Sequence, residues 1–271
     1  MQRGVMKDVA AAQDQRGITI QRVGVKDFHL PVLIRRKSAS DAKVIPYDSV
    51  LARINFSVEL PHQFRGTHLS RFVSILTAWS QKPIASQDLR EMLREAREKL
   101  NARRAEVHFA FKYFITKSAP VSQAESALDY DCLFHAVLED DDFVFTLGVE
   151  VPITCLCPCS REISTAGAHN QRALIRVALR YPPGEFIWIE DLVPQLEAQG
   201  SSQIYPLLKR EDEKFVTEQA YANPKFVEDV LRDVVAVLRA DQRIVWFEAE
   251  VESFESIHNH NAFAYQSEKP R

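Results

Sequence analysis

The feature that most constrains the fold of this chain is a repeated order of strand-forming and helix-forming segments. Alternation of apolar and polar side chains is typical of half-buried strands, whereas apolar side chains three or four positions apart are typical of amphipathic helices. In the first half we expect strands near 50–60, 107–115, 128–138 and 143–155, with helices over 67–81 and from Ser86 to Leu100. The order is therefore one strand, two helices and then further strands.

The same order recurs in the second half of the chain. Alternation over 173–181 predicts a strand, a short helix is expected near 189–199, and alternation over 245–254 predicts a last strand. Between them Asn223 and Pro224 predict the start of a long helix over 223–241, with Asn as the cap. Helices between runs of strands favour an α+β fold, with antiparallel sheet and helices on one face.

We divide the chain into three parts on this pattern. Residues 1–45 are expected to be an N-terminal arm with one short extended piece at 25–33, followed by a first half, 46–160, and a second half, 161–271. Long strands leave sheet edges that must be paired or covered, so we expect a homo-oligomer. A monomer with twisted, charged edges is the alternative.

Charge and hydropathy exclude several classes of partner. The formal net charge of -3 leaves no global basic field for nucleic acid. No signal-peptide core and no run of eighteen apolar residues occur, so we expect no membrane partner and a cytoplasmic location. In such a compartment cysteines are expected to be free thiols.

Three of the four cysteines lie together at residues 155, 157 and 159. Pro158 prevents the preceding strand from continuing, so Cys157 and Cys159 are expected on the turn that leaves the sheet. Cys155 is in phase with the apolar residues of that strand and is expected to be a core thiol. Because C-x-x-C spacing is absent, one thiolate with distant partners on an open catalytic metal fits better than a structural zinc. A site role and a structural role both stay open for Cys159.

Polar residues further along the chain are candidates to complete that site. His169 lies in the polar segment 167–172, and we interpret it as a ligand. Glu228 places a carboxylate beside an apolar helix stripe, where it is either paired or binds a polar ligand. Glu211 belongs to a charge run that composition alone would assign to a solvated face. Of His258 and His260, we expect one rather than both to face a site.

Five segments, taken together, resemble a known enzyme family. They read PITCLCPCSREIS, GAHNQR, YPLLKREDEKFVTE, NPKFVEDVLRD and FESIHNHNA. The chain resembles the type IB GTP cyclohydrolases from about residue 20 to residue 265. This resemblance implies the tunnelling fold, with two β-rich halves that each carry paired helices, and a barrel completed by oligomerisation with active sites at the interfaces. We expect a homotetramer.

The resemblance also implies an activity and a metal. The reaction is the hydrolysis of GTP to 7,8-dihydroneopterin triphosphate and formate, the first step of tetrahydrofolate biosynthesis. Cys157, His169 and Glu211 resemble the residues that hold one divalent ion per site, which is zinc, manganese or iron. A thiolate, an imidazole and a carboxylate are chemically suited to ions of that range.

The remaining roles that the resemblance implies concern the substrate. Glu228 resembles the carboxylate that binds the guanine edge, and His258 resembles the active-site histidine. His258, or Cys159 if it is not a ligand, would carry protons. The triphosphate needs cations, and each candidate could equally be an ordinary surface charge. These candidates are Arg172 and Lys209, with Arg65, Arg161 and Arg210.

Two other functions stay open on the sequence. A tunnelling-fold enzyme could use a cysteine nucleophile on a deazapurine or pterin substrate, as the nitrile reductases that consume NADPH do, and would need no metal. The chain lacks the Glu-Ser-Lys motif of that family. A metal store or chaperone is the non-enzymatic alternative, and it would bind metal without turnover.

Overall fold

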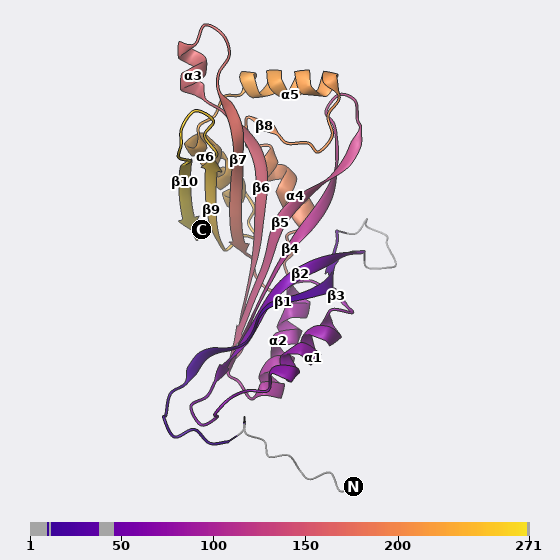
Figure 1. Cartoon of the computed structure of the whole chain (residues 1–271), viewed down its shortest axis with the longest axis vertical. Coiled ribbons are helices and arrows are strands. Elements are labelled where there is room, and N and C mark those ends of the chain that lie inside the picture. The colour runs from indigo at the N-terminus through magenta and orange to yellow at the C-terminus, as the bar shows by residue number, and fades with distance from the viewer. Residues whose placement is uncertain (1–9, 11, 38–45, 270–271) are drawn as a thin grey trace. The chain divides into compact units, whose positions relative to one another are not determined.

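A computed structural model describes residue 10, residues 12–37 and residues 46–269, and it groups the chain into two compact units (Figure 1). Unit 1 comprises Met1–Phe111 and Phe134–Phe145, and unit 2 comprises Lys112–Leu133 and Thr146–Arg271. Strands β4 (Arg104–Ser118), β5 (Glu125–Glu139) and β6 (Asp142–Leu156) contribute residues to both units.

Unit 1 is an antiparallel sheet with two helices on one face. Its own elements are β1 (Ile20–Arg35), β2 (Tyr47–Leu60), α1 (Leu69–Trp79), β3 (Pro83–Ile84) and α2 (Ser86–Leu100). The strand order is β3-β1-β2-β4, in which only the two-residue β3 runs parallel to its neighbour. Both helices lie beside these strands in Figure 1.

Strand register in unit 1 decides which side chains face the helices. Phe56 of β2 pairs with Val107 of β4, both are fully buried, and the Phe56 ring meets Phe72 of α1 edge-on at 5.2 Å. Successive residues of a strand point to opposite faces. The next pair, Ser57 with Glu106, therefore lies on the face away from α1.

The extended part of the N-terminal arm is longer than the sequence indicated. We expected 25–33, whereas β1 covers Ile20–Arg35 and pairs with β2 along most of that length. A register shift between Val25 and Phe28, with Asp27 at a φ of 53°, marks a bulge that interrupts the alternation and hides the strand from a period-two search. Within the predicted arm, residues 1–9, 11 and 38–45 lie outside the described residues.

Unit 2 continues the antiparallel plan in the strand order β10-β9-β7-β6-β5-β4, and β8 pairs with β6. Its strands and helices are β7 (Asn170–Arg180), β8 (Ser202–Gln203), β9 (Trp246–Ser253), β10 (Ala262–Glu268), α3 (Pro158–Ile163), α4 (Ile189–Glu197), α5 (Arg210–Ala222) and α6 (Val227–Ala240). Helix α6 packs on β9 and β10 through a stripe that includes Val230, Val234 and Leu238, all buried.

The prediction that the long helix starts at Asn223 was wrong. Asn223 instead ends α5, and its side-chain amide donates to the carbonyls of Gly200 and Ser201 at 3.0 and 3.4 Å. The Lys225 N–H donates to the Leu156 carbonyl at 3.1 Å. These contacts keep the segment between α5 and α6 non-helical. The tendency of Asn to cap a helix is therefore overridden by hydrogen bonds to distant loops.

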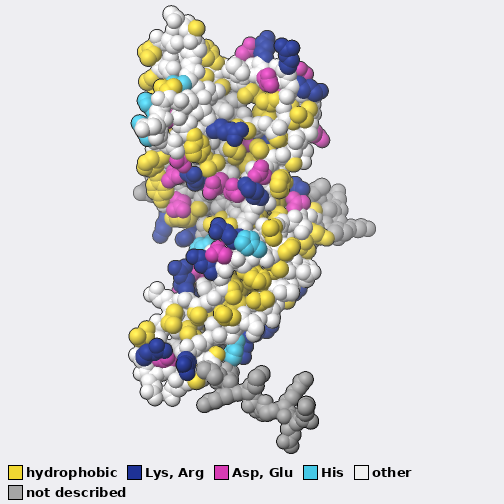
Figure 2. Space-filling view, in the orientation of Figure 1, with side chains coloured by type: hydrophobic (Ala, Val, Ile, Leu, Met, Phe, Trp, Pro, Cys, Tyr) yellow, Lys and Arg dark blue, Asp and Glu magenta, His cyan; other side chains and the backbone are white. Residues whose placement is uncertain are grey.

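The α+β class expected from the sequence is confirmed. Several elements had not been predicted: the short helix α3 after Cys157, the helix α5, the last strand β10 and the two-residue strands β3 and β8. None of the described helices is long and apolar enough to span a lipid bilayer. On the face drawn in Figure 2, Lys and Arg side chains are interspersed with Asp and Glu, in agreement with the net charge of -3.

Candidate functional site

A hollow of about 410 Å³ in unit 2 is lined by site candidates from four motifs of the sequence. They are Cys157, His169, Glu228 and His258. Each comes from a different motif, and the four are separated by as much as a hundred residues of chain. The hollow therefore brings a thiol, two imidazoles and a carboxylate to one space.

The end of the β6–β7 ladder positions Cys157 beside His169. The ladder pairs Leu156 with Asn170, and one step further the Cys157 N–H donates to the His169 carbonyl at 3.1 Å. Cys157 also precedes α3, where the Ser160 N–H donates to its Sγ at 3.4 Å. A sulfur and an imidazole are thus fixed at one strand end by main-chain hydrogen bonds.

The hydrogen bonds of Gln171 determine which nitrogen of His169 is available. The Gln171 Oε1 lies 2.9 Å from His169 Nδ1, while its Nε2 donates to Ser253 Oγ at 3.1 Å and to Glu255 Oε1 at 3.3 Å. An amide oxygen can only accept, so His169 Nδ1 carries the proton. The Nε2 lone pair of His169 is then free for a metal ion, as in many histidine sites held by an outer contact.

Sequence reasoning missed Gln171 and Glu255. Glu255 lines the hollow, lies 4.0 Å from His169 Nδ1 and accepts from Ser253 Oγ at 2.9 Å. The expected strand began at residue 173, whereas β7 begins at Asn170, so no strand pattern in the sequence indicated Gln171. The signal that could have found both residues is the resemblance, because Gln171 lies in the segment GAHNQR and Glu255 in the segment FESIHNHNA.

The other two cysteines of the cluster lie in different environments. Cys155 is buried, and burial raises the pKa of its thiol to about 12. That environment agrees with the core thiol expected from the sequence, although Cys155 also lines the hollow. Cys159 is exposed on α3 and is not among the residues that line the hollow.

His258 and His260 both line the hollow, whereas we expected one rather than both to face a site. Their rings stack with centroids 5.1 Å apart and an interplanar angle of 21°. Both lie in the irregular segment between β9 and β10, which bends so that the two rings stay together.

Besides Cys159, three predicted site residues do not line this hollow. Glu211 is exposed in the first turn of α5, and Lys209 is the exposed residue that precedes this helix. Arg172 follows Gln171 on β7 and so points to the opposite face, where it lines a second hollow of about 410 Å³ with Lys112 and Tyr205. The roles of these three residues stay predictions.

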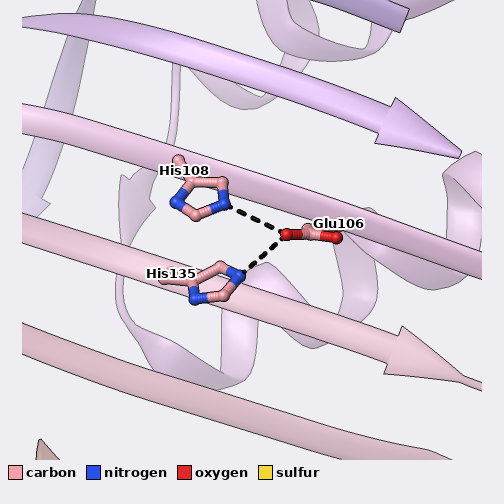
Figure 3. A group of neighbouring side chains, drawn as sticks. All are labelled: Glu106, His108 and His135. Atoms are coloured by element: carbon pink, nitrogen blue, oxygen red, sulfur yellow. Dashed lines mark hydrogen bonds and ion pairs between the residues drawn. The ribbon is translucent and has the colours of Figure 1, made fainter. Parts of the chain in front are cut away.

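A second group of side chains of the types that bind metal ions lies in unit 1 (Figure 3). Glu106 and His108 come from β4 and His135 from β5, and their donor atoms all lie within 4.8 Å of one another. Hydrogen bonds from His108 and His135, together with the nearby Arg104, hold the pKa of Glu106 well below its usual range. This group, which we call the triad, is compatible with a divalent metal ion. No motif in the sequence pointed to it.

The fold has a counterpart among solved structures. The uricase of Arthrobacter globiformis superimposes with a TM-score of 0.55 and 6% sequence identity, over 92% of this chain and 93% of that one. A likeness at that identity concerns the fold alone. The fold is the tunnelling fold.

Sequence comparison extends the likeness to a family. A family profile described as type I GTP cyclohydrolase folE2 matches residues 6–264. The GTP cyclohydrolase FolE2 of Geotalea uraniireducens (strain Rf4) is 51% identical over 259 residues, which is 96% of this chain and 92% of that protein. The FolE2 of Magnetococcus marinus is 46% identical over 260 residues, covering 96% and 95%. The chain therefore belongs to the type I GTP cyclohydrolase folE2 family.

Proposed function

We propose that this protein is a GTP cyclohydrolase of type IB, which hydrolyses GTP to 7,8-dihydroneopterin triphosphate and formate in the hollow of unit 2. One observation carries the proposal: Cys157, His169, Glu228 and His258, from four separate motifs, line one space in a member of this family. Its volume of about 410 Å³ lies within the range usual for small-molecule sites. The reaction would open the tetrahydrofolate pathway.

The donors at the strand end fit a divalent ion. Cys157 offers a sulfur and His169 a free Nε2, a pair that suits zinc and iron and, with a carboxylate, manganese. A divalent ion bound there supplies a Lewis acid and lowers the pKa of a water molecule toward neutrality. Because Glu211 lies outside the hollow of its own chain, we propose that a second copy supplies it as the third ligand.

Glu228 is proposed to select the base. It is the second residue of α6 and is exposed at the hollow, so its carboxylate can accept hydrogen bonds from guanine N1–H and the exocyclic amino group. Adenine has no hydrogen at N1 and would leave that carboxylate unsatisfied. Phe226 and Phe263, exposed rings that line the same hollow, offer faces to a purine.

His258 is proposed to move protons during ring opening. Water adds to C8 of the guanine and the bond between C8 and N9 breaks, which leaves C8 as a formamide on N7. A second water then cleaves the bond between C8 and N7 and releases C8 as formate, and one water is returned when the ribosyl carbons condense with N7 to close the new ring. The nitrogens freed in these steps need protons, and an imidazole both accepts and donates near pH 7. His260 stacks on His258 and would fix the orientation of that ring.

Self-association is part of the proposal. Strand β10 ends the described strand order of unit 2 and carries the exposed rings of Phe263 and Tyr265, which a neighbouring copy would cover. A homotetramer would bring Glu211, Lys209 and Arg172 of other copies toward each hollow. We place the enzyme in the cytoplasm, where the thiols of Cys157 and Cys159 stay reduced.

The test is a formate-release assay on metal-stripped protein reconstituted with zinc, manganese or iron. We expect formate from GTP, none from ATP, and activity only after metal is restored. Oxidation of NADPH with a deazapurine nitrile would instead support the cysteine-nucleophile alternative. Stoichiometric metal binding with no turnover of either substrate would support a metal store.

A further inference from the structure

We propose that Glu106, His108 and His135 bind a second divalent ion, of the zinc class, which ties β4 to β5 in unit 1. This site uses none of the residues proposed for GTP hydrolysis. It rests on the geometry of the three side chains, on the charges around them and on the strands that carry them.

The three donor atoms already stand near the spacing that an ion requires. His108 Nε2 and His135 Nε2 each lie 3.1 Å from the same Glu106 oxygen, Oε1 (Figure 3). Metal–ligand bonds of about 2.0–2.1 Å in a tetrahedral site place neighbouring donors about 3.3 Å apart. Small side-chain movements would therefore admit an ion between the two nitrogens and the oxygen.

The sheet holds the triad in place. Glu106 and His108 are two residues apart on β4 and so share a face, and β5 is the hydrogen-bonded neighbour that carries His135. The imidazole rings stack with centroids 3.8 Å apart and an interplanar angle of 11°. Both Nε2 atoms therefore point toward one position, as Figure 3 shows, and little conformational entropy is lost when an ion binds.

The two arginines near Glu106 have different roles. Arg104 donates to the other carboxylate oxygen, Oε2, at 2.7 Å, which orients the carboxylate and leaves Oε1 toward the histidines. Its charge is partly balanced by Glu139, 3.6 Å away. Arg22 lies 3.4 Å from Oε1, and its side chain is 63% exposed, so it can move into solvent when a cation takes its place.

The donor set defines the class of ion. Two imidazoles and one carboxylate are borderline ligands that suit zinc, cobalt, nickel or ferrous iron better than calcium or copper(I). Three protein ligands leave a position for water. Because the donors come from two adjacent strands, the expected effect is a mechanical one: the ion fastens β4 to β5.

Cobalt(II) and zinc(II) are the probes for the test, added to the full-length protein after metal removal. We expect two cobalt ions per chain for the wild type and one for the double variant His108→Gln/His135→Gln. His29→Gln, which removes an exposed histidine of β1 in the same unit, is the matched control and should still bind two. A double variant that binds as many ions as the wild type would overturn the proposal.

Absorption spectra separate the two ions. Thiolate-to-cobalt charge transfer requires a sulfur ligand, so it should disappear in Cys157→Ala while the weaker ligand-field bands of the triad remain. The double variant His108→Gln/His135→Gln should keep the thiolate charge-transfer band and lose the ligand-field bands of the triad. If wild-type protein released no formate from GTP but still bound the triad ion, only the proposed function would fail. If Cys157→Ala bound no cobalt at all, the triad proposal would fail.

Arg22 provides an independent check that does not remove a ligand. If Arg22 competes with the ion, Arg22→Gln should bind cobalt at the triad about three- to ten-fold more tightly, since a nearby like charge is removed. Lys26→Gln, another exposed cation of β1, should leave the affinity unchanged. Unchanged or weaker binding by Arg22→Gln would show that no cation displaces Arg22 from Glu106.

Discussion

The triad of unit 1 and the hollow of unit 2 position their proposed metal ligands in opposite ways. In the triad every donor comes from within a strand, and two nitrogens already face one oxygen. In the hollow the donors lie at a strand end, in a loop and at a helix start, around about 410 Å³ of free space. A preassembled set suits holding an ion, whereas catalysis also needs room for a substrate beside the ion.

Cys157→Ala should separate the two regions most clearly. Loss of the sulfur donor is expected to lower kcat/KM for GTP roughly 10³-fold or more, because several kcal/mol of Lewis-acid assistance disappear. Metal analysis and formate release on the same samples provide the measurement. Cys132→Ala, which removes a buried thiol of β5 outside the hollow, is the control. Near-normal turnover by Cys157→Ala would mean that the hollow is not the metal-dependent site.

Glu228→Gln should affect the substrate and not the metal. A lost hydrogen bond between a charged carboxylate and guanine is expected to lower kcat/KM about 10- to 100-fold, with metal content unchanged. Steady-state kinetics with GTP, beside metal analysis, measure both. Glu218→Gln on α5, whose carboxylate pairs only loosely with Lys214 at 3.8 Å, should behave as the wild type. Equal kinetics for the two variants would remove Glu228 from the site.

Gln171→Ala should weaken metal binding in unit 2 about ten-fold, because His169 Nδ1 loses the acceptor that keeps its proton there. Gln171→Glu keeps an acceptor and should restore most of that affinity. Cobalt titration followed through the thiolate band reports the hollow alone, so the triad does not interfere. If Gln171→Ala and Gln171→Glu weakened metal binding equally, the contact between Gln171 and His169 would contribute to packing and not to the orientation of the imidazole.

The smallest effect concerns the chemical reactivity of Cys155 and Cys159, and it is measured on the wild-type protein without an activity assay. Burial raises the pKa of Cys155 to about 12, so at pH 8 only about one molecule in 10⁴ carries its thiolate. Alkylation followed by mass spectrometry should modify the exposed Cys159 first and Cys155 last. Raising the pH toward 12 should increase the thiolate fraction of Cys155. Equal rates for Cys155 and Cys159 at pH 8 would contradict this burial.

Much of the fold could be predicted because its strands are half-buried and therefore alternate. The pattern over 50–60 and the helix from Ser86 to Leu100 are confirmed by β2 and α2. The start of α6 could not be predicted, because Asn223 is held by carbonyls of residues 200 and 201, which no local rule includes. The full length of β1 was hidden by its bulge at Asp27.

The two candidate sites differ in how far they could be predicted. Cys157 and His169 lie near one another in the sequence and belong to distinctive motifs, so the sequence could indicate this candidate site. His135 lies close to Glu106 only because β5 pairs with β4. In the sequence His135 is a single histidine in an apolar segment, so no local pattern marked it. Nor could the sequence show that Arg172 points away from Gln171, since strand boundaries determine which residues share a face.

The hydrogen bond from Cys157 to the His169 carbonyl extends the β6–β7 ladder one step beyond its last strand pair. Inserting or deleting one residue at the start of β7 would exchange the two faces of the strand. Gln171 would then point to the hollow that Arg172 lines and away from His169. A one-residue insertion or deletion in β7 should therefore harm this site more than most single substitutions in the strand.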